Sequence, residues 1–178
     1  MDFDDVLKKR RMVRSFKERQ VDEAQTMRLV KNAQRAPSAG FLQQQEFLIV
    51  RNKEIKVQLA KAAVGQEFIA QAPVVIVVCS NTDRVAKRYG ERGFNFYSVI
   101  DGTFASMLIL LTAVNEGLGA CFVGAFNDSE VRRILKLPKA VKPIGIIPVG
   151  FANEPPEKFE RMRLEEIVYY ERYGERKS

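Results

Sequence analysis

Three arginines near the start of the chain form a candidate anion site. Arg10, Arg11 and Arg14 fall within five residues and are separated only by the apolar residues Met12 and Val13. A guanidinium group stays charged at any working pH, and its planar fork fits a phosphate. Three side chains at this spacing cannot share one helix face, so a ligand that contacts all of them needs a turn or a helix end. Taken alone, the cluster equally suits a solvated basic face at the end of a helix.

The chain of 178 residues contains no histidine, and this excludes several kinds of site. A Ser-His or Cys-His catalytic pair, a His-containing zinc site and a histidine general base are ruled out. Cys79 and Cys121 lie far apart in apolar surroundings, so we expect two small core residues and no disulfide or metal pair. The chemistry must therefore come from carboxylates, lysine, tyrosine, backbone groups or a bound cofactor.

The net charge of +7 permits a nucleic-acid partner, a phosphate-bearing cofactor or anionic substrates. The basic residues are spread along the chain, which weakens the nucleic-acid interpretation. The apolar share of 46% and charged share of 29% are typical of a globular domain with a sizeable core. No apolar run reaches about 18 residues, so no membrane span is expected. The acidic start lacks a signal-peptide layout, so we expect a cytoplasmic protein.

Helical and strand patterns alternate along the chain, which predicts a layered helix-sheet-helix domain. Helices are predicted over residues 2–9, 22–35, 54–72 (interrupted at Gly65-Gln66) and 101–117, and from the cap Asn127 to Pro138. Strands are predicted over residues 47–50, 74–79, 121–123 and 144–149, with 167–170 as a further candidate. Gly145 and Pro148 place the 144–149 strand near a sheet edge. The polar, basic and aromatic segment 81–97 is a candidate mobile lid.

The order and spacing of several motifs resemble the nitroreductase family of flavin enzymes over nearly the whole chain. The motifs are Arg10-Arg11-x-x-Arg14-x-Phe16, Ala36-Pro37-Ser38-Ala39-Gly40-Phe41-Leu42-Gln43, Gly65-Gln66 ahead of Ala72-Pro73, Gly117-Leu118-Gly119 leading to Val123-Gly124-Ala125-Phe126, and Gly150 followed by Arg161-x-x-Leu164-Glu165-Glu166. The resemblance implies one α+β domain over residues 1–178, with a three-layer helix-sheet-helix fold. It also implies an intertwined homodimer, one FMN at each of two interface sites, and a tail of about residues 160–178 that reaches over the partner subunit.

The resemblance further implies which cations and amides hold the FMN. Arg10 and Arg161 are expected at the phosphate, with Arg11 near the ribityl-phosphate end. Arg14 matches the family position near the pyrimidine edge of the ring, where a cation stabilises the reduced flavin. Gln66 matches a residue that pairs with the same polar edge, for which an amide has both donor and acceptor.

Small residues are implied around the flat face of the ring. The loop residues expected to pack there from the other subunit are Pro37, Ser38, Ala39 and Gly40, followed by Gln43 of the same motif. Val123 and Gly124 would run behind the ring, with a backbone N–H near the reactive N5. No side chain is assigned as a catalytic residue, because the flavin itself carries the electrons.

Five positions depart from the family pattern. Met12 stands where the family commonly has a serine that helps to hold the phosphate, and can offer only its backbone there. Phe41 replaces the usual asparagine, and Gln44-Gln45 replaces the usual Pro-Trp. Phe159 stands where a cation is frequent. These departures bear on the phosphate and substrate contacts and leave the overall pattern intact.

The predicted function is an FMN-dependent oxidoreductase. It takes hydride from NADH or NADPH to flavin N5 and passes the electrons, in a second step, to a flat electrophile such as a nitroaromatic or a quinone. The residues do not distinguish NADH from NADPH.

Two alternatives stay open at this stage. The same fold could fragment the flavin or remove halogen from an aromatic substrate, with the substrate defined by residues of the candidate lid, namely Arg84, Arg88, Tyr89, Arg92 and Tyr97. A less favoured alternative is a basic nucleic-acid-binding module, which predicts an affinity that falls steeply with salt.

Overall fold

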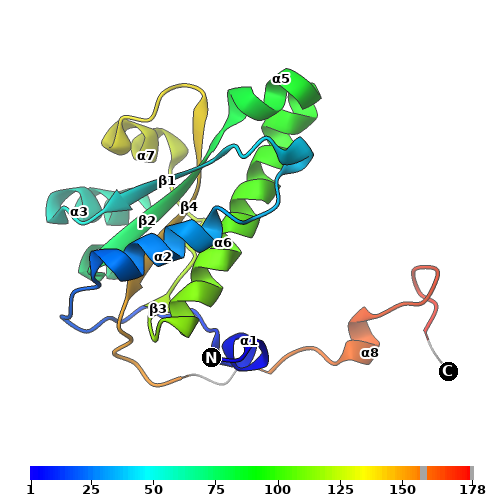
Figure 1. The fold of residues 1–178 in the computed structure, drawn as a ribbon, viewed down its shortest axis with the longest axis horizontal. Helices are drawn as coiled ribbons and strands as arrows, with labels where there is room; N and C mark the ends of the chain where they lie inside the picture. Colours follow the sequence, from blue (N-terminus) through cyan, green and yellow to red (C-terminus); the bar gives the residue numbers. More distant parts are fainter. Residues whose placement is uncertain (157–159, 177–178) are drawn as a thin grey trace.

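A four-stranded antiparallel sheet lies at the centre of the molecule, with helices on both of its faces (Figure 1). The computed structural model describes residues 1–156 and 160–176. The strand order is β1-β2-β4-β3. The strands are β1 (Gln45–Val50), β2 (Val74–Asn81), β3 (Gly119–Ala120) and β4 (Val141–Gly150).

Strand β2 is buried on both faces, because successive side chains of a strand point to opposite sides. Val75 and Val77 pack into one core, and Val74 and Ile76 pack into the other. The first core is covered by α3 (Lys53–Ala62), α4 (Phe68–Gln71) and α7 (Asp128–Leu135). The second is covered by α2 (Glu23–Ala33) and α6 (Ser98–Asn115). The predicted three-layer arrangement is confirmed.

The predicted helix caps are also confirmed. The Asp22 side chain accepts the Gln25 N–H at 2.6 Å at the start of α2. Asn127 accepts the Glu130 N–H at 3.0 Å at the start of α7. Asp2 caps α1 (Phe3–Lys9) in the same way. Each cap satisfies a backbone donor that the first helical turn leaves unpaired.

The segment predicted as a candidate lid is helical. It forms α5 (Thr82–Arg92) and a π-turn, η2 (Gly93–Tyr97), which continues into α6. Gly90 interrupts α5 with a φ of 55° and a ψ of −139°, a backbone conformation that glycine adopts readily. Helix α6 therefore begins at Ser98, ahead of the predicted start at Asp101.

The prediction that the 144–149 strand lies near an edge is wrong. Strand β4 lies inside the sheet, between β2 and β3. Gly145 is required there because the Phe122 ring occupies the space that a Cβ atom would fill. The regular pairing of β3 with β4 ends at Ala120 and Val149. Pro148 lies just beyond it, where its carbonyl accepts the Cys121 N–H at 3.2 Å, so the proline falls outside the regular ladder between these two strands.

Two shorter strand predictions also differ from the structure. Of residues 121–123, only Val123 forms a bridge, to Ile146, and β3 lies just before this segment. In the described part of the tail, residues 167–170 form no strand, and α8 (Leu164–Ile167) ends where the strand was expected to begin.

The continuous helical run Thr82–Asn115 is strongly apolar over part of its length. By length and composition alone it could cross a membrane, because an 18-residue window within it has a mean hydropathy of 1.6. Half of the apolar window is buried inside the molecule, and buried core helices satisfy the same criteria. Its buried side packs on the sheet and on α2 (Figure 1).

Candidate functional site

An open groove of about 1240 Å³ brings together the arginines predicted at the two ends of the chain. Its lining includes Arg10, Arg11, Met12, Arg14, Glu160 and Arg161. Within residues 1–156 and 160–176, no carboxylate forms an ion pair with Arg10, Arg14 or Arg161. These three arginines in one groove suit a multiply charged anion such as a phosphate.

The N-terminal wall of the groove is held against the segment that follows β3. The Val13 N–H donates to the Ala120 carbonyl at 3.0 Å, and Val13 itself is buried. A Cβ atom on Gly119 would come within 2.6 Å of Val13 Cγ2, so glycine is needed for this close approach. Met12 Sδ accepts the Phe122 N–H at 3.4 Å. Met12, which departs from the family pattern, therefore holds the backbone of Phe122 in place through its sulfur.

Arg11 is tied to Glu154 and is not an open cation. Its Nη1 lies 3.2 Å from Glu154 Oε1, and its Nη2 donates to the Glu154 carbonyl at 2.7 Å. The same Oε1 accepts the Arg14 backbone N–H at 3.0 Å. Glu154 therefore fixes the turn that separates the side chains of Arg10 and Arg14. The sequence gives no signal for this role, because Glu154 lies 140 residues from Arg14.

The predicted residues Gln66, Val123 and Gly124 lie on neighbouring segments. Gln66 Nε2 donates to the Ala63 carbonyl at 3.0 Å and to the Ala125 carbonyl at 3.4 Å. The Val123 N–H donates to the Ile146 carbonyl at 2.9 Å, so it is already used. The Gly124 N–H makes no hydrogen bond within the described residues, and Gly124 is exposed. Of the two predicted backbone donors, Gly124 is the available one.

The loop from Pro37 to Gln43 is a tight turn with an unusual backbone. Ser38 Oγ accepts the Gln43 N–H at 3.0 Å and closes the loop on itself. Gly40, Phe41 and Gln43 have φ angles of 58°, 56° and 48°. A left-handed conformation at two non-glycine residues stores backbone strain of about 1–3 kcal/mol each, which concentrates at functional sites. The Phe41 side chain is 78% exposed.

Asp101 anchors this loop from beneath, and sequence reasoning missed it. Its Oδ2 accepts the Ala39 N–H at 2.8 Å and also accepts the side-chain amide of Gln44. Both side chains are buried, and burial raises the pKa of Asp101. Gln44 Oε1 is buried without a hydrogen-bond partner in the described structure. Two features of the sequence could have indicated this contact: Asp101 is a carboxylate in a mainly apolar helix, and Gln44 departs from the family pattern.

The 37–43 loop and the segment after α1 that carries the groove arginines lie at opposite ends of α6 within one chain (Figure 1). The loop contacts Asp101 in the first turn of the helix, whereas the groove segment packs on Gly119 and Ala120 just beyond its last turn. Helix α6 has 18 residues and so spans about 27 Å. One chain therefore does not bring the predicted phosphate contacts together with the ring contacts expected from residues 37–40.

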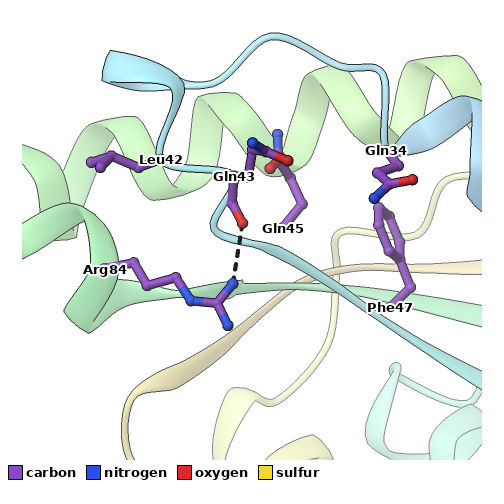
Figure 2. A pocket seen from close by; sticks show the side chains of 6 residues that line it. All are labelled: Gln34, Leu42, Gln43, Gln45, Phe47 and Arg84. Atoms are coloured by element: carbon purple, nitrogen blue, oxygen red, sulfur yellow. Dashed lines mark hydrogen bonds between the residues drawn. The ribbon is translucent and has the colours of Figure 1, made fainter.

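A second hollow, of about 440 Å³, lies on the outer side of the loop (Figure 2). Figure 2 shows Arg84 reaching toward the loop, where its Nη1 donates to the Gln43 carbonyl at 3.1 Å. Arg84 Nη2 also lies 3.1 Å from Glu46 Oε1. Both of these contacts hold Arg84 as a brace between α5, the loop and β1.

The remaining predicted positions are the two cysteines and Phe159. Cys79 and Cys121 are buried free thiols, as expected, and burial raises the pKa of Cys79 to about 12. No group of three or more metal-ligating side chains occurs in the part of the chain that the structure describes. Phe159 lies outside the described residues.

The nitroreductase family model matches residues 7–66 and 60–151, and so covers the N-terminal side of the groove, the loop and the sheet. The chain belongs to the nitroreductase family. Family membership agrees with the resemblance seen in the motifs and accounts for the layered sheet.

Individual relatives give the same result. The FMN reductase [NAD(P)H] of Bacillus subtilis is 30% identical over 177 residues, which cover 92% of this chain and 71% of that protein. A Methanocaldococcus jannaschii protein with a nitroreductase name is 40% identical over 101 residues, or 57% of this chain, and the match spans half of that relative's length. The crystal structure of a nitroreductase family protein from Streptococcus pneumoniae superposes with a TM-score of 0.87 at 25% identity, covering 95% of this chain and 100% of that one.

Proposed function

We propose that this nitroreductase-family protein is a homodimeric, FMN-dependent NAD(P)H oxidoreductase that acts in the cytoplasm on flat electrophiles such as nitroaromatics or quinones. The observation that carries the proposal is the groove in which Arg10, Arg14 and Arg161 meet without carboxylate partners among the described residues. The similarity to a Bacillus subtilis FMN reductase that uses NAD(P)H supports the choice of cofactor and donor.

The donor set of the groove fits the phosphate of FMN. Arg10 and Arg161 approach from different ends of the chain, so together they can hold a dianion from two sides. Arg11 contributes by fixing the turn through Glu154. Arg14 lines the same groove and would place positive charge near the pyrimidine edge of the ring, where it stabilises negative charge on the reduced flavin.

The loop and the free backbone donor fit the ring of FMN. Pro37 to Gly40 presents small side chains, so backbone can approach a flat ligand closely. Asp101 holds the Ala39 N–H from below and keeps this surface in place. Gly124 offers an N–H that has no hydrogen-bond partner among the described residues, and Gln66 lies beside the same segment.

Dimerisation completes the site because the loop and the groove of one chain lie at opposite ends of α6. An apolar surface along α1, α6 and the tail supports a dimer interface. Its exposed side chains are Phe3, Leu7, Val99, Phe104, Met107, Leu164 and Ile167. The described tail extends away from the body of the molecule, as expected of an arm that embraces a partner (Figure 1). We infer that the tail from residue 160 covers the other subunit of a single-domain protomer.

FMN, when bound, supplies the two-electron chemistry that a chain without histidine cannot supply itself. The protein contributes binding, orientation and electrostatics. In the overall reaction a nitroaromatic takes the two electrons of one NAD(P)H together with two protons, one N–O bond breaks, and a nitroso product and water form. The open groove and the exposed loop leave room for the donor and the acceptor to bind in turn.

The experiment that tests this proposal is a visible absorption spectrum of the purified protein, followed by anaerobic addition of NADH or NADPH. A bound-flavin spectrum that bleaches with one nucleotide supports the reductase and identifies its donor. A colourless protein that takes up no added FMN contradicts the proposal. Loss of FMN when the reduced protein meets oxygen would instead favour flavin fragmentation on the same fold.

A further inference from the structure

Five side chains of α5 and η2 form a compact cluster of cations and aromatic rings, which we call the Arg88–Tyr97 cluster. Its members are Arg88, Tyr89, Arg92, Phe96 and Tyr97. The Arg92 guanidinium lies 4.6 Å from the Phe96 ring centroid and 5.4 Å from that of Tyr97. Arg88 lies 5.4 Å from the Tyr89 ring centroid. Tyr89 and Tyr97 pack edge to face with centroids 5.1 Å apart.

The backbone of this segment departs from a regular α-helix, and this sets the directions of the side chains in the cluster. Gly90 breaks the helix between Arg88 and Arg92 with a positive φ of 55°. The π-turn from Gly93 to Tyr97 follows at once. Kinks and π-turns redirect the side chains around them and are frequent at functional sites. A regular α-helix would not give the same placement of the two arginines relative to the tyrosines.

The cluster touches the loop that faces the flavin ring in the proposed function. Arg88 Nη1 donates to the Gly40 carbonyl at 3.4 Å. A Cβ atom on Gly40 would lie 2.6 Å from the Tyr89 hydroxyl and 2.8 Å from Arg88 Nη1. Any ligand that rests on this loop therefore comes within reach of the cluster.

The charges of the two arginines in the cluster are not balanced by carboxylates of the described residues. Neither Arg88 nor Arg92 forms an ion pair within residues 1–156 and 160–176, whereas Arg84, on the same helix, pairs with Glu46. Both guanidinium groups are exposed and stack on aromatic rings. Arg88 uses Nη1 on the Gly40 carbonyl and Arg92 uses Nε on the Tyr97 hydroxyl at 3.2 Å, and the remaining guanidinium donors can bind an oxyanion.

We propose that the Arg88–Tyr97 cluster binds the electron acceptor and selects planar aromatic carboxylates over neutral aromatics of the same size. The aromatic body would stack on the cluster rings and the carboxylate would accept hydrogen bonds from Arg88 and Arg92. This inference rests on the proposed function, since it places the cluster beside the flavin. In a model reaction, 4-nitrobenzoate takes two electrons from one NAD(P)H and two protons, and leaves as 4-nitrosobenzoate and water.

The experiment compares 4-nitrobenzoate with the neutral 4-nitrobenzamide in the wild-type protein and in the variant Arg88→Gln/Arg92→Gln. We expect kcat/KM for 4-nitrobenzoate to fall by about tenfold or more in the variant, since a tenfold change corresponds to about 1.4 kcal/mol. The value for 4-nitrobenzamide should change by less than about twofold. KM for the anion should also rise with salt in the wild type and much less in the variant.

Lys87→Gln is the matched control, because it removes one positive charge from α5 next to the cluster and Lys87 is exposed. This control should leave the ratio of the two acceptors unchanged. Equal losses for both acceptors in the double variant, or the same loss in Lys87→Gln, overturn the proposal.

Binding of the two acceptors by calorimetry separates this proposal from the proposed function, because it needs no turnover. A wild type that binds both acceptors with equal affinity overturns the selectivity, even where NAD(P)H bleaches the flavin normally. A wild type that prefers 4-nitrobenzoate, with the preference lost in the double variant, supports it even where NAD(P)H does not bleach the flavin.

Discussion

The carboxylate of Asp101 accepts the backbone N–H of Ala39 at 2.8 Å and so joins the core of α6 to the loop proposed to face the flavin. Replacing Asp101 with alanine leaves this N–H and the buried Gln44 amide without a partner. We expect the free energy of unfolding to fall by about 1–3 kcal/mol, together with a clear loss of FMN affinity. Urea unfolding and fluorescence titration with FMN measure the two effects. Asp101→Asn is the control, because an amide can still accept the Ala39 N–H. Equal effects of the two substitutions would contradict the anchoring role.

Asp101 also predicts a pH dependence of stability. Burial raises its pKa above the ordinary value of 3.8, so the folded state binds this proton more tightly than the unfolded state does. The contribution of Asp101 to stability is therefore complete below about pH 3.8 and is lost as the pH rises through the folded-state pKa. We expect the wild type to lose stability relative to Asp101→Asn as the pH rises from about 4 to about 7. The measurement is the free energy of unfolding of both proteins across this range. A constant difference would contradict the raised pKa.

Arg10 predicts a selective effect on the phosphate of the cofactor. We expect Arg10→Gln to weaken FMN binding by about tenfold to a hundredfold, because one charge-assisted hydrogen bond contributes about 1.5–3 kcal/mol. Riboflavin, which lacks the phosphate, should bind the variant and the wild type equally. The matched control is Arg163→Gln, since Arg163 pairs with Glu166 at 3.0 Å and does not line the groove. Equal losses for both flavins would argue against a phosphate contact.

Arg11 should behave differently from Arg10, although the two are neighbours. Its guanidinium is engaged with Glu154, and both side chains are mostly buried. Arg11→Gln and Glu154→Ala should each lower the free energy of unfolding by about 1–3 kcal/mol. Arg11→Gln should weaken FMN and riboflavin by similar factors, because it disturbs the turn and not the phosphate itself. A loss confined to FMN would show that Arg11 contacts the phosphate directly, as the family resemblance implies.

Local signals in the sequence predicted much of the fold correctly. The caps Asp22 and Asn127 lie at the helix starts where they were expected, because capping depends on residues three positions apart. The apolar run of β2 predicted a strand buried on both faces. The position of β4 was predicted wrongly because Gly145 was taken as the sign of an edge strand. The glycine is needed because the Phe122 ring packs against it, and this contact between distant segments is not visible in the composition.

Only those residues of the candidate site that belong to a sequence motif could be predicted. The arginines of the groove are placed together as the resemblance implies, but their different states were not predictable. Arg11 is neutralised by Glu154, which is 143 residues away. Asp101 was read only as part of a helix, since its partners Ala39 and Gln44 are set by tertiary packing. Long-range pairing of charges leaves no local pattern in a single sequence.

The exposed apolar face of α6 predicts that dimerisation and cofactor binding fail together. Met107 lies on this face and is 46% exposed in the single chain. We expect Met107→Glu to give a monomer by light scattering, because two charges would be buried at the interface. The monomer should bind FMN weakly, since the loop and the groove of one chain lie at opposite ends of α6. Met27 on α2 has the same exposure of 46%, so Met27→Glu is the matched control and should remain a flavin-binding dimer. A Met107→Glu monomer with wild-type FMN affinity would show that one chain holds the whole site.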